Sequence, residues 1–167
     1  MMLTKVGLLM LILSNTAINL IEVRNLYEIA ANNKSANAKL INLLADVKMD
    51  NALLTGYKGA AIMMEANHVF NPITKLSRFR KGKQLLEYAI KLDGVNVELR
   101  YIRLTIQTNV PGILGYSSAI EIDKKIIINQ LELLKDKDLR NRMISYLIRA
   151  NVCNSEELRR INVWKNK

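Results

Sequence analysis

Residues 82–99, GKQLLEYAIKLDGVNVEL, constrain the fold more than any other stretch of the chain. Apolar residues at three- and four-residue spacing, including Leu86 and Ala89, predict the last turns of a helix. Gly94 favours the left-handed conformation that closes a helix, so we expect that helix to end there. Asn96 is a preferred N-cap residue and predicts the start of the next helix. The stretch therefore predicts a helix, a short turn and a second helix.

The residue inventory favours helices throughout. Half of the residues are hydrophobic, but only one Trp, six Tyr and two Phe are aromatic, so the core must be mainly aliphatic. Two prolines and seven glycines supply too few turn signals for the many short strands of a sandwich or barrel. A chain of 167 residues fits one domain. We therefore expect an all-α fold.

Apolar spacing and start signals predict a series of helices with short connections, which is typical of an irregular α-α superhelix of about seven helices. The first helix is expected to bury Leu20, Ile21, Leu26, Ile29 and Ala30. Gly56–Ala61 in the third helix is rich in small residues and predicts a close helix contact. Start signals are read at Asp50, at Asn71–Pro72, at Ser118 with Glu121 as a capping box, at Asp136 or Asp138, and at Asn154 or Ser155.

The N-terminal segment predicts export. Lys5 precedes the apolar run Val6–Leu13, which is followed by the small and polar stretch Ser14–Ala17. The run is shorter than the ~20 residues that span a bilayer, so we expect residues 1–17 to be a signal peptide and the mature form to carry no integral membrane span. Residues 18–167 would then form one all-α domain in the periplasm or cell envelope. The alternative is a retained first helix in a cytoplasmic protein.

The sequence also resembles known helical proteins. Gly82, Leu86 and Ala89, followed by Leu92-Asp93-Gly94, resemble the second helix and the turn of a tetratricopeptide repeat. The stretch from Tyr57 to Tyr116 resembles small exported proteins of Bacteroidota that have no assigned activity. These resemblances imply an exported helical-repeat protein that binds another molecule without catalysing a reaction.

Few residues suggest catalysis, and we expect no catalytic residue, no metal and no cofactor. His68 and Cys153 are the only histidine and the only cysteine, so neither a disulfide within the chain nor a multi-cysteine zinc site is possible. A hydrolase would require His68 to meet Cys153 or a carboxylate in a pocket. Gly112–Gly115 has the GxxG spacing of a nucleic-acid clamp, but its apolar centre favours a tight turn, a docking knob or a plug into the core.

Positive charge is the strongest indication of a partner. The chain carries 25 Lys and Arg against 15 Asp and Glu, a formal charge of +10. Such a chain attracts acidic proteins, lipid headgroups or nucleic acid, although a solvated basic face is the simpler interpretation. Cations gather between residues 75 and 103. A candidate groove for a protein or other acidic ligand would be lined by Arg78, Lys81, Arg100, Arg103 and Tyr116. The alternative is a cytoplasmic module that binds nucleic acid there, and the oligomeric state stays open.

Overall fold

The computed structural model describes residues 18–165 of the chain. These residues form eight α-helices and two short 3-10 helices, and this described part contains no β-strand, so the predicted all-α fold is confirmed. The predicted signal peptide, residues 1–17, lies outside the described residues. In chain order the elements are α1 (Leu20–Ala30), α2 (Lys34–Leu43), α3 (Ala52–Glu65), η1 (Ala66–His68), α4 (Pro72–Leu92), α5 (Val97–Asn109), η2 (Gly112–Leu114), α6 (Ile120–Gln130), α7 (Lys137–Arg149) and α8 (Ser155–Lys165).

Short polar side chains begin most of the helices. An Asn or Asp oxygen at the N-cap accepts a hydrogen bond from a free N–H group of the first turn. Helices α1 to α5, α7 and α8 are capped in this way by Asn19, Asn33, Asn51, Asn71, Asn96, Asp136 and Asn154. The starts predicted at Asn71, Asn96, Asp136 and Asn154 are therefore confirmed.

Two predicted helix starts are each wrong by one residue. The side chain of Asn51, not that of Asp50, accepts the bond at the start of α3. Helix α6 begins at Ile120 and has no side-chain cap, so Ser118 and Glu121 do not form a capping box. At α3 the neighbouring Asn51 serves as the cap in place of Asp50, whereas at α6 the N-cap position is occupied by Ala119.

The turn after α4 differs from the one expected at Gly94, which has no positive φ. The N–H of Asp93 instead bonds to the carbonyl of Ala89 at 3.0 Å. The side chain of Asn96 donates to the Asp93 carboxylate at 3.0 Å, and Arg100 donates to the carbonyl of Gly94 at 2.8 Å. Because side chains close this turn, it does not need the left-handed residue that glycine would supply.

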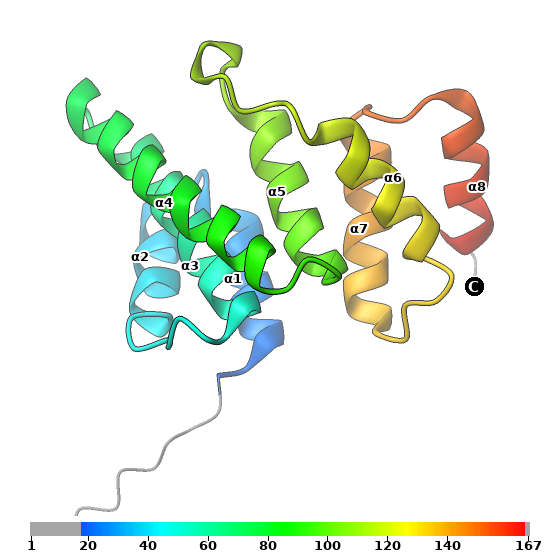
Figure 1. The fold of residues 1–167 in the computed structure, drawn as a ribbon, viewed down its shortest axis with the longest axis horizontal. Helices are drawn as coiled ribbons and strands as arrows, with labels where there is room; N and C mark the ends of the chain where they lie inside the picture. The colour runs from blue at the N-terminus through cyan, green and yellow to red at the C-terminus, as the bar shows by residue number, and fades with distance from the viewer. Residues whose placement is uncertain (1–17, 166–167) are drawn as a thin grey trace, which may run out of the picture.

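The helices pack as successive pairs. Each even-numbered helix packs against the odd-numbered helix before it, and the odd-numbered helices also contact one another in chain order. Figure 1 shows the pairs following one another along the long axis, with α1 to α4 toward one end and α8 at the other. This arrangement is compatible with a helical-repeat protein.

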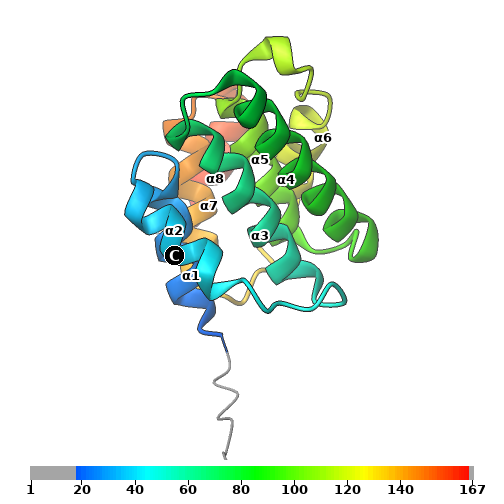
Figure 2. The same ribbon diagram turned by 90° about the vertical axis from the view of Figure 1, so that its left-hand side faces the viewer.

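The closest helix contact is the crossing of α3 and α4, which lie side by side in Figure 2. A Cβ atom added at Gly82 would lie 2.3 Å from the carbonyl oxygen of Gly59, and one added at Gly59 would lie 2.7 Å from the carbonyl oxygen of Gly82. Neither position therefore has room for a side chain. The close contact predicted from the small residues of Gly56–Ala61 is confirmed.

Helix α5 belongs to two groups of buried apolar side chains. Leu99 and Ile102 pack with α1 to α4, whereas Tyr101 and Leu104 pack with α6, α7 and α8. All residues from 101 to 107 are buried. Helix α5 therefore connects the first four helices with the last three.

The buried side of α1 is only partly the one expected: Ala30 is buried and Leu20 and Leu26 pack against the core, as predicted. Ile21 and Ile29 are 52% and 50% exposed, and the buried stripe is formed by Val23, Tyr27 and Ala30. Tyr27 is accommodated in the core because its hydroxyl hydrogen-bonds with Thr105 of α5. The expectation for Ile21 and Ile29 was therefore wrong, and Ile29 instead lines the groove described next.

Candidate functional site

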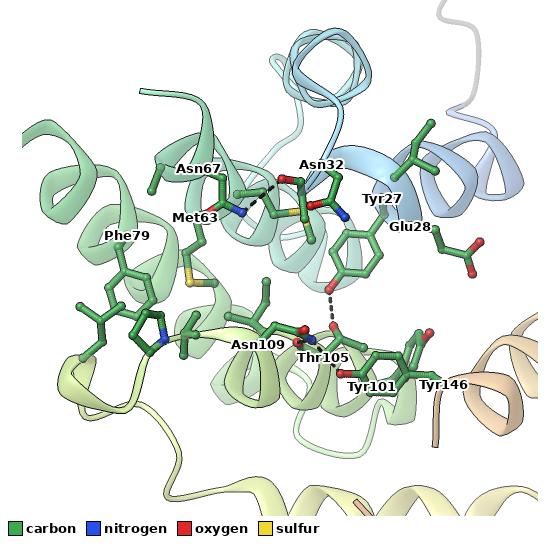
Figure 3. A pocket seen from close by; sticks show the side chains of 18 of the residues that line it. Tyr27, Glu28, Asn32, Met63, Asn67, Phe79, Tyr101, Thr105, Asn109 and Tyr146 are labelled. Atoms are coloured by element: carbon green, nitrogen blue, oxygen red, sulfur yellow. Dashed lines mark hydrogen bonds between the residues drawn. The ribbon is translucent and has the colours of Figure 1, made fainter. Parts of the chain in front are cut away.

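A groove of about 1240 Å³ lies between the odd-numbered helices (Figure 3). All four of them, α1, α3, α5 and α7, contribute side chains, together with the start of α4 and the loop after α5. Pockets for small molecules usually measure about 300–1,000 Å³. The groove is therefore large enough for a segment of a polymer.

Asparagine side chains recur along the groove, which is lined by Asn25, Asn32, Asn67, Asn109 and Asn141. Three of them are engaged within the protein: Asn25 accepts from Arg142 at 2.6 Å, Asn67 donates to the carbonyl of Ala31 at 3.2 Å, and Asn109 donates to the hydroxyl of Tyr146 at 2.9 Å. Within the described part of the chain, Asn32 and Asn141 make no such side-chain bond, and both are exposed. Their amides are available to a ligand.

One wall of the groove is apolar. It is formed by side chains from α3, α4, α5 and the loop after α5, namely Met63, Met64, Leu76, Phe79, Ile106, Val110, Pro111, Ile113 and Leu114. Phe79 is held in place by an edge-on contact with Tyr116, with ring centroids 5.9 Å apart. Leu76 is 37% exposed. This wall can take up an apolar side chain.

The opposite end, at α7, is charged. Arg142 pairs with Glu28 at 2.8 Å and with Asp138 at 2.9 Å, and these hydrogen bonds raise its pKa. The guanidinium of Arg149 lies 6.0 Å from the ring centroid of Tyr146, within the range of a cation–π contact. Arg149 is exposed and makes no ion pair within the described residues. It can therefore pair with an anionic group of a ligand.

Tyrosines form the floor between these ends. Burial raises the pKa values of Tyr27 and Tyr101, so their hydroxyls stay protonated at neutral pH. Figure 3 shows the hydroxyl of Tyr27 directed at Thr105 and that of Tyr146 beside Asn109. The polar floor therefore supplies neutral hydrogen-bonding groups.

None of the five predicted ligand-binding residues is among the residues that line this groove. Arg103 is buried in a two-bond ion pair with Asp123, at 2.6 and 2.8 Å, and it also donates to Glu87 at 2.9 Å. Arg100 shares Asp123 at 3.4 Å. Both arginines thus neutralise a fully buried carboxylate, so this pair of cations connects α5 with α6.

The other three predicted residues differ in burial and in their partners. Tyr116 is 4% exposed and donates to Glu87 at 2.5 Å, and burial raises its pKa. Arg78 pairs with Glu65 at 3.2 Å on a half-exposed surface, whereas Lys81 is exposed on α4. The structure brings together Arg100, Arg103 and Tyr116 through Asp123 and Glu87. Ligand binding at the five residues stays a prediction.

His68 and Cys153 lie in different parts of the fold. The Nε2 atom of His68 lies 2.7 Å from the carbonyl oxygen of Ala30, so the ring connects η1 with α1. Cys153, half-buried between α7 and α8, packs with the second apolar group, and burial raises its pKa. Among the described residues, no group of three or more His, Cys, Asp or Glu is placed to hold a metal ion. The structure does not bring His68 and Cys153 together, since His68 contacts α1 and Cys153 packs with the second apolar group.

The Gly112–Gly115 segment forms the turn η2, and Gly115 takes the left-handed conformation with φ of 58°. Ile113 at its tip is 94% exposed, whereas Tyr116 just after it is buried in the core. The segment is therefore a tight turn, as the sequence favoured, and Tyr116 after it fills the core, whereas docking at its exposed tip stays a prediction.

Comparison of the chain with protein-family models, with curated proteins and with solved structures gave no match. No helix in the described part of the chain is both long enough and apolar enough to cross a membrane. The class of protein defined by the structure is therefore an all-α protein of paired helices with a concave groove. The groove was not predicted from the sequence, since its lining residues come from several elements that only the fold brings together.

Proposed function

We propose that this chain is a non-enzymatic interaction protein whose groove binds an extended segment of a partner protein in the cell envelope. The observation that carries the proposal is the groove itself, to which all four odd-numbered helices contribute. Tetratricopeptide-like architecture fits this role, since stacked helix pairs create extended concave surfaces for binding. The pairing of helices in the fold and the resemblance of residues 82–99 support this finer classification.

The chemistry of the groove favours a peptide segment. An asparagine amide both donates and accepts hydrogen bonds, as a peptide group does, so it can pair with a partner backbone of any sequence. Asn32, in the turn after α1, and Asn141, in α7, offer such amides. The apolar wall around Leu76 and Ile113 would take an apolar side chain of the same segment, and Arg149 would favour an acidic residue. This combination agrees with the expectation of a protein or other acidic ligand.

The test uses peptides selected from a random-peptide phage library on the immobilised protein. The selected peptide is synthesised with a fluorescent label, and its affinity is measured by fluorescence anisotropy. Replacing both Asn32→Leu and Asn141→Leu should weaken binding about tenfold or more, because each hydrogen bond contributes about 0.5–1.5 kcal/mol. Asn42→Leu on α2 is the matched control, since Asn42 is exposed but does not line the groove.

Two results would contradict the proposal. One is a library that yields no binder. The other is a binder whose affinity is the same for wild type and for the Asn32→Leu/Asn141→Leu protein. The side chains of Asn32 and Asn141 are exposed and make no hydrogen bond within the described residues. Circular dichroism should therefore show unchanged helix content in the variants.

The envelope location is tested separately by mass spectrometry of the protein from fractionated native cells. A mature N-terminus near Ile18 in the envelope fraction supports export. An intact Met1 in the cytosol contradicts it and favours the cytoplasmic alternative, but leaves the groove proposal to be judged by its own experiment.

A further inference from the structure

The outward face of α4 is cationic in the middle of the helix and at its C-terminal end. Arg80, Lys81 and Lys91 are exposed there, and within the described part of the chain none of them makes an ion pair. The one carboxylate of α4, Glu87, accepts hydrogen bonds from Arg103 and Tyr116, and so does not neutralise these cations. The positive charge of this face is therefore available to an anionic surface.

Two large apolar side chains stand at the N-terminal end of this helix. Phe70, just before the N-cap, is 100% exposed, and Ile73 in the first turn is 81% exposed. Ile73 lies seven and eight residues before Arg80 and Lys81, so these three side chains share one side of α4. The fold leaves both apolar side chains in water, where they contribute nothing to the core.

We propose that this face of α4 docks on an anionic lipid bilayer, with Phe70 and Ile73 entering the headgroup region. A bilayer surface receives apolar side chains and anchors cations at the same time. A nucleic acid would be held by its phosphates through the cations and would leave Ile73 unused. The contact lies along the bilayer surface, because α4 is too polar to cross it. This docking surface is separate from the groove and does not depend on the function proposed for it.

The test is sedimentation of the full chain with vesicles of phosphatidylcholine containing phosphatidylglycerol. Phe70→Ser with Ile73→Ser should weaken binding about tenfold, and Arg80→Gln with Lys81→Gln should weaken it by a similar factor. Val95→Ser with Leu133→Ser is the matched control, since those side chains are 84% and 78% exposed but lie outside α4. All variants retain residues 1–17, so any contribution of that segment is common to them.

A second measurement reports on the site itself. Tryptophan emission of a Phe70→Trp protein should shift to shorter wavelength when anionic vesicles are added, and that of a Val95→Trp protein should not, relative to wild type. Binding that is lost in the Arg80/Lys81 variant but unchanged in the Phe70/Ile73 variant, or an emission at position 70 that does not shift, would overturn the proposal. If only the Arg80/Lys81 variant loses binding and the wild-type protein also binds single-stranded DNA tightly, this face of α4 is a surface for polyanions instead.

Discussion

Arg24 and Glu98 lie 74 positions apart in the chain, yet they form a buried ion pair with two hydrogen bonds, 2.7 Å from Nε to Oε1 and 2.8 Å from Nη2 to Oε2. Each residue is 4% exposed. The hydroxyl of Tyr57 also donates to Glu98 at 2.6 Å, and Arg24 pairs with Asp136, the N-cap of α7, at 2.8 Å. This one cluster therefore connects α1, α3, α5 and the start of α7.

Glu98→Ala should lower the free energy of unfolding by about 3–5 kcal/mol, because it leaves the buried guanidinium of Arg24 without its main partner. Urea unfolding followed by circular dichroism measures the change. Arg78→Ala is the comparison, since its pair with Glu65 is half-exposed and such pairs contribute about 0–1 kcal/mol. Equal losses in the two variants would contradict the structural role of the buried pair.

Arg103→Ala should likewise destabilise the fold by about 3–5 kcal/mol, since Asp123 is fully buried and would lose its closest partner. Lys81→Ala, on the exposed face of α4, should change the free energy of unfolding by less than about 0.5 kcal/mol. Thermal unfolding of both proteins separates the two roles. A stable, well-folded Arg103→Ala protein would show that Arg103 is available for ligand binding, as the sequence suggested.

Gly82→Ala should be strongly destabilising although alanine is the better helix former by about 1 kcal/mol. The new Cβ atom would meet the carbonyl oxygen of Gly59 and the backbone N of Met63, at 2.3 and 2.7 Å, so α3 and α4 must move apart. Gly94→Ala is the control, because its nearest contact would be an ordinary 3.5 Å. Differential scanning calorimetry should show a lower Tm for Gly82→Ala alone, and a raised Tm would disprove the tight crossing.

Acid should weaken the contacts between α1 and α7. Hydrogen bonding from Arg142, with a further contribution from Arg24, lowers the pKa of Asp138. Burial acts to raise the pKa of Asp136, but the Leu139 N–H and Arg24 outweigh it, and the pKa is lowered. Lowered folded-state pKa values stabilise the protein above the unfolded value of about 3.9, and this contribution is lost as the pH falls through the folded values.

The free energy of unfolding in urea should therefore vary little on account of these two groups between about pH 7 and pH 5, and should fall below about pH 4. The protein with Asp136→Asn and Asp138→Asn is the control, and its stability should fall less over the acid range. An identical acid profile for control and wild type would place the responsible carboxylates elsewhere.

Local signals in the sequence predicted the helices well. Asn71 before Pro72, and Asn96 after the turn, determine where α4 and α5 begin because a cap acts on N–H groups only two or three residues away. The error at Asp50 arose because the neighbouring Asn51 can cap the same helix. At Gly94 the expected left-handed turn is absent because the guanidinium of Arg100, in the following helix, donates to the Gly94 carbonyl and helps to close the turn.

The candidate site could not be predicted in this way. Cations near Arg100 and Arg103 suggested a ligand groove, but Asp123, some 20 positions later, receives both of them in the folded protein. The asparagines of the groove lie on α1, η1, α5, α7 and the turn after α1, and whether they face one groove depends on how these segments stack. A charge count along the chain does not show which carboxylate a side chain will meet.

By itself, the sequence determined that the chain is helical and where most helices start, because propensity, apolar period and capping act over a few residues. Only the tertiary structure decided which side of each helix is buried, which arginines are neutralised and where a groove forms. The reason is that burial and ion pairing depend on contacts such as Arg24 with Glu98, between residues that the chain keeps 74 positions apart.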